Sequence, residues 1–178
     1  PEDPPEGCNL AADLEAARPM RTLPAPAVLS LRIAPGSLEL ADWDATIERT
    51  LQRMPLVLQA PPETPAIVAD LPPSWGAILP AVLLCADAVL VVAEARALGL
   101  TGLVRLLDLI DRAREQHRRL ALVGIVPSRV PRTRAGRMIL ERLQTRYRQT
   151  LPPIREAAAV PETTLYNRTL WETPGELP

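Results

Sequence analysis

Short apolar runs bounded by polar or turn-forming residues mark the predicted strands of this chain. They lie at residues 27–33, 67–70, 88–93 and 120–126. The run at 66–69 is apolar throughout, as expected of a strand covered on both faces, and Pro72 with Pro73 ends it because proline cannot continue a ladder. We therefore expect residues 67–70 to form the central strand of the sheet.

Helical periodicity marks the segments between these strands. It predicts helices at residues 37–54, 76–85, 101–118 and 134–148, and a short helix is compatible with residues 9–17. Ser37 is a suitable cap for the first of the long helices. The inner face of that helix is expected to carry Leu40, Trp43, Ile47 and Leu51.

The clearest amphipathic helix is residues 101–118. Leu103, Leu107 and Ile110 line one of its faces, and the opposite face is polar, with Arg105, Asp108, Arg112 and Glu115. In the helix at 134–148 the buried positions are expected to be Ile139, Leu143 and Tyr147.

Alternating strands and helices determine the predicted fold class. Such alternation favours parallel strands joined by right-handed crossovers. We predict an α/β fold with a mostly parallel sheet and helices on both faces, in one domain spanning residues 1–178. The flanks at 1–25 and 152–178 are expected to be irregular apart from the short helix and one further helical turn.

Composition agrees with a single packed core. The chain has 178 residues, of which 47% are hydrophobic, and it contains no Phe, so Leu, Val, Ile and Ala must fill the interior. No apolar run reaches the length of a membrane span and no signal peptide is visible. Cys85 lies in an apolar stretch and is expected to be a buried reduced thiol, whereas His117 between polar neighbours is expected at the surface.

The first candidate for chemistry is Asp70, which ends the predicted central strand. Ligands of α/β sheets bind at the carboxyl ends of the strands. A carboxylate placed there can hold a magnesium ion through water, or it can simply accept hydrogen bonds from the turn that follows. The residues of this segment alone leave both interpretations open.

The order of motifs along the chain resembles that of the ParA/MinD group of partition and positioning ATPases, which are P-loop proteins. The resemblance covers about four-fifths of the chain. It rests on an Asp-x-Pro-Pro-Ser-x-Gly turn, an Ala-Asp-x-Val-Leu strand, a Gly-Leu helix start, a Gly-Ile strand and an Arg-Thr loop. These are residues 70–76, 86–90, 102–107, 124–126 and 132–134, with further similarity at 34–40 and 3–7.

The resemblance implies a P-loop fold, with ATP and magnesium as the cofactors of the parent family. It assigns Asp70 as the catalytic and metal-binding carboxylate, and Asp3 as part of a switch loop. It also implies a set of nucleotide-binding residues near the base, namely Ser128, Arg129, Pro153, Ile154 and Arg155. An ion pair with Glu156 is the alternative interpretation of Arg155.

The phosphate-binding part of such a site is not present in this sequence. A phosphate loop needs glycines and a lysine, but the chain has no lysine and no Gly-x-x-x-x-Gly-Lys spacing. Arginine does not substitute freely for the compact ammonium group in a tight loop. We expect the latter part of a ParA-like protein, or a relative without the loop, and no tight ATP binding or hydrolysis by this chain. Without a neighbouring strand, residues 67–70 are expected to expose their backbone and apolar side chains.

A second candidate is a basic surface in the latter part of the chain. Residues 112–155 contain twelve arginines against Glu115 and Glu141, although the net charge of the whole chain is only −1. Such a surface fits tracking of nucleic-acid phosphates, and ordinary solvated helix faces are the alternative. Few aromatic residues accompany the arginines, which favours duplex backbone contact over base stacking. The predicted DNA-binding residues are Arg112, Arg114, Arg118, Arg119, Arg132, Arg134, Arg137, Arg142, Arg146 and Arg148.

Together these features predict a ParA-like partition protein that binds DNA under nucleotide control during plasmid or chromosome segregation. The resemblance implies a homodimer, non-specific double-stranded DNA and a centromere-binding protein as partners, no membrane, and a cytoplasmic, nucleoid-associated location. The alternative is a non-catalytic DNA-binding or adaptor module that keeps only the scaffold.

Overall fold

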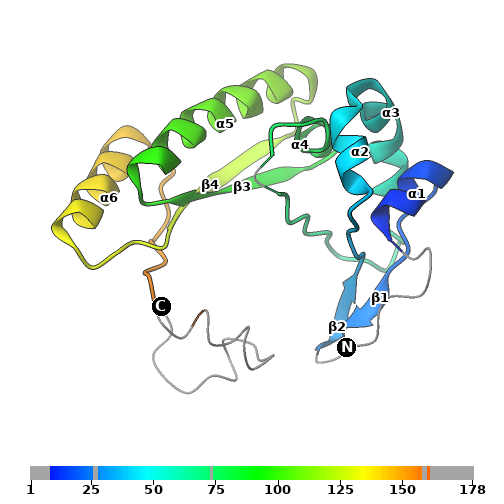
Figure 1. Ribbon diagram of the computed structural model, residues 1–178, viewed down its shortest axis with the longest axis horizontal. Helices are drawn as coiled ribbons and strands as arrows, with labels where there is room; N and C mark the ends of the chain where they lie inside the picture. Colours follow the sequence, from blue (N-terminus) through cyan, green and yellow to red (C-terminus); the bar gives the residue numbers. More distant parts are fainter. Residues whose placement is uncertain (1–8, 26–27, 73, 158–159, 161–178) are drawn as a thin grey trace. The chain divides into compact units, whose positions relative to one another are not determined.

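The computed structural model describes residues 9–25, 28–72, 74–157 and 160. These residues form two compact units (Figure 1). Unit 1 comprises Pro1–Ala86 with Ala113–Arg118, and unit 2 comprises Asp87–Arg112 with Arg119–Pro178. The fold is of the α/β class, as predicted, and it contains a parallel strand pair with helices. None of the described helices is both long and apolar enough to cross a membrane.

Unit 1 is built mainly from four helices whose apolar faces meet in one core. The helices are α1 (Leu10–Ala16), α2 (Leu40–Ala45), α3 (Ile47–Val57) and α4 (Ile78–Leu83). Each contributes at least one buried side chain, including Leu14, Trp43, Met54 and Ile78. No single helix of this length is stable alone in water, so the shared core is what holds them.

Helix α1 confirms the short helix that the sequence predicts within residues 9–17. The Asn9 side chain accepts a 2.9 Å hydrogen bond from the backbone N–H of Ala12 and so caps the first turn. At the other end Ala17 adopts a left-handed conformation with φ of 49°, and its N–H closes the helix on the carbonyls of Asp13 and Leu14.

The helix predicted at 37–54 is instead two helices, because the backbone breaks at Thr46 (φ −116°, ψ 86°). The break rotates the second helix, so that Ile47 is 61% exposed, contrary to the predicted inner face. Thr50 is buried in its place, with its hydroxyl 2.6 Å from the Trp43 carbonyl oxygen. No side chain caps α2, so the predicted role of Ser37 is also wrong.

The strand predicted at 27–33 forms, but its partner was not predicted. Strand β2 (Val28–Ile33) pairs antiparallel with β1 (Leu23–Ala25), with Leu23 opposite Ile33. Arg32 supports the pair by donating a 2.6 Å hydrogen bond to the Thr22 hydroxyl. The sequence predicts an irregular structure for residues 23–25, as part of the irregular flank at 1–25, and this prediction is wrong. Pro24 is tolerated here in a strand of only three residues.

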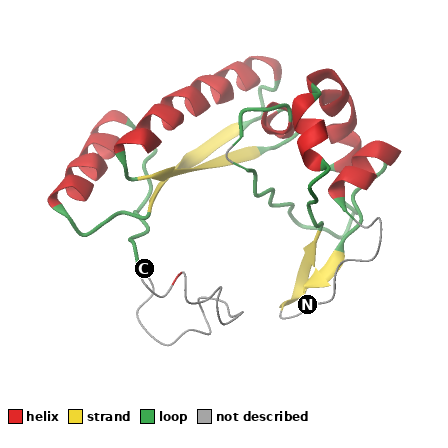
Figure 2. Cartoon of the chain, in the orientation of Figure 1, coloured by secondary structure: helices red, strands yellow, loops and turns green. Residues whose placement is uncertain are grey.

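The largest departure from the sequence prediction is at residues 67–70. All of them are described, and none forms a strand; residues 59–77 run as a loop apart from the undescribed residue 73 (Figure 2). Val68 is 92% exposed and Asp70 is also exposed. An apolar run becomes a strand only when another strand satisfies its backbone groups, and no described strand pairs with this one.

Unit 2 contains the parallel pair, β3 (Ala88–Glu94) and β4 (Ala121–Ser128), joined by the long helix α5 (Ala97–Gln116). Helix α6 (Arg134–Arg146) follows β4. The register places Val91 beside Ile125 and Glu94 beside Ser128. These four elements agree with the predicted positions, and a helix connects the two parallel strands as expected.

Alternation along β3 separates a buried face from an open one. Val91 and Ala93 are 2% and 5% exposed, whereas Leu90 and Val92 between them are 52% and 63% exposed. On α5, Leu103 and Ile110 are buried as predicted, whereas Leu107 is only partly buried. The sheet therefore has apolar cover on one face only, within the described part of the chain.

Beyond β4, a short segment at residues 149–151 extends the sheet. The N–H of Ile125 donates to the carbonyl of Gln149 at 2.9 Å, and the N–H of Leu151 donates back to Ile125 at 2.8 Å. A glycine at position 124 permits this close approach. A Cβ atom there would lie 2.8 Å from both the Gln149 carbonyl oxygen and the Leu151 side chain.

Candidate functional site

A cluster of charged side chains lies where β3 and β4 end. Glu94 is the last residue of β3, and Arg129 follows the last residue of β4. Arg129 Nη1 lies 2.8 Å from Glu94 Oε1, and its other terminal nitrogen lies 3.9 Å from Glu156 Oε1. Arg96 Nη2 is 3.6 Å from the same Glu156 oxygen. Two arginines and two glutamates thus neutralise one another at the carboxyl edge of the sheet.

The backbone of residues 153–156 is held against this edge. Ile154 donates to the Pro127 carbonyl at 2.8 Å, Val130 donates to Ile154 at 3.1 Å, and Glu156 donates to Val130 at 3.1 Å. Two segments far apart in the sequence therefore lie side by side. They are the ones predicted near the nucleotide base, namely Ser128 with Arg129 and Pro153 with Ile154 and Arg155.

The turn after β4 has an unusual backbone. Arg129 has φ of 51°, in the left-handed region that non-glycine residues seldom adopt. Two neighbouring interactions accompany this conformation. The Arg129 guanidinium bonds to Glu94, and the next residue, Val130, forms a β-bridge with Arg155. Such outliers persist only where the surroundings fix them, and they concentrate at functional sites.

Arg155 differs from the other charges of this edge. Glu156, its predicted alternative partner, binds Arg96 and Arg129 instead. Arg155 is exposed, and within the described residues its side chain makes no hydrogen bond or ion pair. It is consequently the uncompensated positive charge beside the neutral cluster.

Of the two carboxylates predicted for the magnesium and switch part of the site, one lies within the described residues. Asp70 belongs to unit 1 and lies in the exposed loop, and Asp3 lies outside the described residues. No group of three carboxylate, histidine or cysteine side chains converges in the described part. The chain also offers no lysine for phosphate. The described residues therefore offer neither a metal-binding cluster nor a lysine, and they do not fit a magnesium–triphosphate group.

The turn that follows Asp70 is nevertheless anchored. Asp44 Oδ1 accepts a 3.0 Å hydrogen bond from the N–H of Ile78, and the Asp44 carbonyl accepts one from Ala77 at 2.8 Å. Both bonds satisfy N–H groups at the start of α4. Gly76 passes so close to the Asp44 carboxylate that a Cβ atom would overlap it. Asp44 was not recognised from the sequence because it lies more than thirty residues from the turn it caps.

The ten predicted DNA-binding arginines are all exposed. Some of them already have partners: Arg112 forms a 3.0 Å ion pair with Asp108, and Arg146 lies over the Tyr147 ring. Around α6 a group of five makes no side-chain hydrogen bond or ion pair with any described residue. This group, which we call the α6 arginines, is Arg132, Arg134, Arg137, Arg142 and Arg148.

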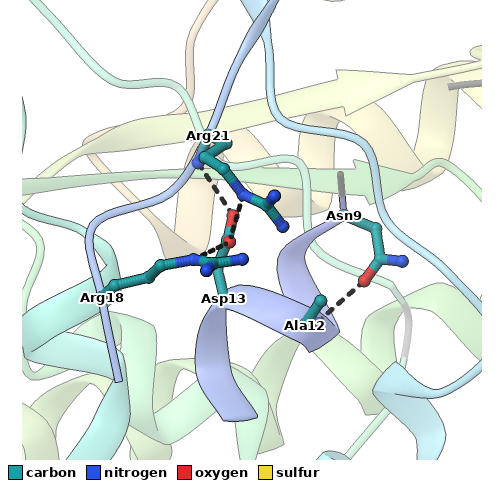
Figure 3. A network of polar contacts seen from close by, with 5 residues as sticks. All are labelled: Asn9, Ala12, Asp13, Arg18 and Arg21. Atoms are coloured by element: carbon teal, nitrogen blue, oxygen red, sulfur yellow. Dashed lines mark hydrogen bonds and ion pairs between the residues drawn. The ribbon is translucent and has the colours of Figure 1, made fainter. Parts of the chain in front are cut away.

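A buried carboxylate in unit 1 was missed by the sequence analysis. Asp13 is fully buried and accepts 2.8 Å hydrogen bonds from the side chains of Arg18 and Arg21 and from the backbone N–H of Arg21 (Figure 3). Burial tends to raise the pKa of Asp13, but these three hydrogen bonds outweigh it and hold the pKa below its ordinary value of 3.8. The network fixes the chain that leaves α1, which is a structural role.

Two other side chains complete the account of unit 1. His117 is not a free surface residue as predicted, because it is half-buried with Nε2 3.0 Å from the carbonyl oxygen of Ala86. Cys85 is a free thiol, as predicted, and it is half-buried. Burial raises the pKa of the Cys85 thiol, which favours its protonated form.

No protein-family model and no curated protein matches this sequence. Solved structures do. The ATP complex of McdA from Cyanothece superposes with a TM-score of 0.77 at 18% identity, over 96% of this chain and 71% of that one. Cobyrinic acid a,c-diamide synthase from Mycobacterium smegmatis, with an ATP analogue and magnesium, gives 0.70 at 20% identity, over 99% and 78%.

A plasmid partition protein from Borrelia burgdorferi gives a TM-score of 0.64 at 19% identity, over 90% of this chain and 69% of that one. At these identities the likeness establishes the fold. The similarity to the ParA/MinD-like P-loop ATPases that the sequence motifs suggested is therefore confirmed at the level of architecture.

Proposed function

We propose that this chain belongs to a ParA-like partition protein and provides its surface for non-specific double-stranded DNA. The observation that carries the proposal is the group of α6 arginines, which are exposed and have no described partner. A guanidinium that is already paired with a carboxylate adds little to the free energy of DNA binding. An unpaired guanidinium can neutralise a DNA phosphate and so release the counterions condensed on the DNA. The fold shared with a plasmid partition protein supports the same function.

Nucleotide control is the second part of the proposal. In this scheme Ser128, Arg129 and residues 153–155 contact the base, with ATP and magnesium as in the parent family. Because the described residues do not fit the phosphates of ATP, this scheme requires a phosphate-binding loop in addition to them for gating and hydrolysis. A homodimer and a centromere-binding partner complete the scheme as the resemblance implies.

Fluorescence anisotropy on two labelled duplexes of unrelated sequence tests the DNA proposal. We expect equal affinity for both duplexes and a steep loss with salt. The triple variant Arg134→Glu, Arg137→Glu, Arg148→Glu should weaken binding more than tenfold and flatten the plot of log affinity against log salt. Removal of three phosphate contacts should lower that slope by about 3 units, at roughly 0.9 per contact.

The matched control replaces the same three arginines by lysine. Lysine keeps the charge, so binding to duplex DNA should persist if phosphates are tracked without specific geometry. Asp70→Ala should leave nucleotide-independent binding unchanged, since Asp70 belongs to the loop of unit 1. Salt-insensitive binding, or none from a folded sample at low salt, would contradict the proposal.

A non-catalytic adaptor is the second candidate, and one observation favours it. Asp70 stands in an exposed loop rather than at the end of a strand, where the parent family uses this carboxylate. Because both candidates predict weak ATP binding by this chain alone, calorimetry with ATP and magnesium separates them on a protein that also supplies a phosphate-binding loop: micromolar binding there supports the nucleotide-gated protein, and its absence from a folded sample supports the adaptor.

A further inference from the structure

A groove between α5 and α6 in unit 2 is not used by the functions considered so far. Its main hollow of about 720 Å³ is lined by Val104 from α5 and by one side of α6, including Met138, Leu143 and Tyr147. A second hollow of about 640 Å³ shares Val104 and continues along α5 to Asp108. Val104 and Met138 are 52% and 45% exposed, although both are apolar.

The charges around this groove are mostly positive. The main hollow is lined by two arginines of α6, Arg142 and Arg146, and by Glu141, the one acidic residue of that helix. Arg142 lines the hollow and has no hydrogen-bond or ion-pair partner for its side chain among the described residues. Asp108, on the α5 side, is already paired with Arg112 at 3.0 Å. The groove thus has an apolar floor and a rim on which two arginines outnumber one glutamate.

We propose that the α5–α6 groove binds an acidic amphipathic helix of a partner protein. The apolar stripe of such a helix would cover Val104 and Met138, and its flanking carboxylates would face Arg142 and Arg146. The groove wall on α6 runs from Met138 to Arg146, which corresponds to about 12 Å of helix, enough for about two turns of a ligand.

The chemistry of the groove favours this ligand over its competitors. An added strand would find no free backbone groups here, because both walls are helices whose N–H and C=O groups bond internally. Duplex DNA would use the arginines but would gain nothing from an exposed valine and methionine between them. The proposal therefore does not depend on DNA binding, although both ligands would compete for Arg142.

Binding is tested with the full 178-residue chain, labelled with ¹⁵N, and three synthetic amphipathic peptides. All three have leucine at helical spacing, and their flanking positions carry glutamate, glutamine or lysine. We expect affinity in the order glutamate, glutamine, lysine, with amide shift changes confined to α5 and α6. Equal or reversed affinities, no binding by any peptide, or shift changes elsewhere would overturn the proposal.

Variants separate this site from the DNA surface. Val104→Thr with Met138→Gln makes the floor polar at nearly constant volume and at exposed positions, so the fold should persist. This double variant should weaken binding of the glutamate peptide at least tenfold and leave duplex binding unchanged. Val123→Thr, at a 56% exposed valine of β4, is the matched control and should change neither.

Two results would assign the groove to another ligand and overturn the proposal. One is loss of duplex binding in the double variant in parallel with loss of peptide binding, which would make the groove part of the DNA surface. The other is a concentration-dependent dimer in sedimentation that the double variant abolishes, which would make a second copy of this chain the occupant.

Discussion

Residues 66–70 and strand β3 have nearly the same sequence pattern but different structures. Each is an apolar, β-branched run that ends in a carboxylate, Asp70 in the first case and Glu94 in the second. Strand β3 pairs along its whole length with β4, and Val91 and Ala93 on one face are buried. Residues 66–70 have no described strand partner, and Val68 is 92% exposed.

The difference shows that an apolar run with strand propensity forms a strand only when a ladder is available. A strand has no internal hydrogen bonds, so its backbone groups must be satisfied by another segment or by water. For β3 that segment is β4, which is in turn bonded to residues 149–151. For residues 66–70 the described chain provides none, and water is the alternative partner.

Breaking the ladder should have the largest effect. Ile125→Pro removes the 2.9 Å bond from the Ile125 N–H to Gln149 and an entirely buried side chain, so unfolding free energy should fall by more than about 3 kcal/mol. Amide hydrogen exchange of residues 88–94 should then approach that of residues 66–70. Chemical denaturation and exchange measured by NMR provide the two readouts.

The matched control is Val68→Pro in the exposed loop. It should change stability by less than about 0.5 kcal/mol, as is usual for surface positions without partners. An equal loss of stability in both proline variants would show that residues 66–70 do form a ladder in solution.

The second prediction concerns the turn after residues 66–70. Gly76→Ala places a methyl group against the Asp44 carboxylate, and relieving this overlap must disturb the cap of α4. We expect a loss of about 1–3 kcal/mol in unfolding free energy. Adding Asp44→Ala to Gly76→Ala should cost less than the sum of the single changes, because the overlap is then removed. Strict additivity in thermal or urea unfolding would contradict the contact.

The third prediction tests the most ordered polar network of unit 1. Asp13→Asn should lower stability at neutral pH by about 1–3 kcal/mol, because two guanidinium groups lose their buried carboxylate. Since the folded pKa of Asp13 lies below 3.8, its contribution is complete above that value and is lost as pH falls through the folded pKa.

Urea unfolding of the natural chain and the Asp13→Asn variant at a series of pH values checks this sign. The stability difference between them should stay constant from pH 7 to the ordinary pKa of 3.8 and shrink below it. A difference that grows on acidification would mean that the pKa of Asp13 is raised on folding.

The smallest effect is expected at Asp70. Because its carboxylate is exposed and has no described partner, Asp70→Asn should alter unfolding free energy by less than about 0.5 kcal/mol. A larger loss, measured by urea unfolding, would indicate that Asp70 has an interaction in solution, as a strand-end carboxylate would.

The local elements were largely predictable from sequence. Helical periodicity placed α1, α5 and α6, and apolar runs placed β2, β3 and β4 within a few residues. The exposure of the arginines and the apposition of residues 128–129 with 153–155 were also anticipated. These features depend on side-chain chemistry within a segment or on motif order, both of which the sequence contains.

The errors arose wherever a distant partner decides the outcome. The break at Thr46 follows from packing of α2 and α3 in one core, and the capping of α4 requires Asp44 from an earlier helix. The buried state of Asp13 depends on Arg18 and Arg21 folding back over it.

By itself, the sequence determined which segments are amphipathic and where positive charge accumulates. Only the tertiary structure decided that 88–94 is a strand and 66–70 is not, and that Arg129 is neutralised while Arg155 is uncompensated. The physical reason is that helices and caps satisfy their backbone groups within a few residues. Ladders, buried charges and ion pairs need partners that only the folded chain can bring together.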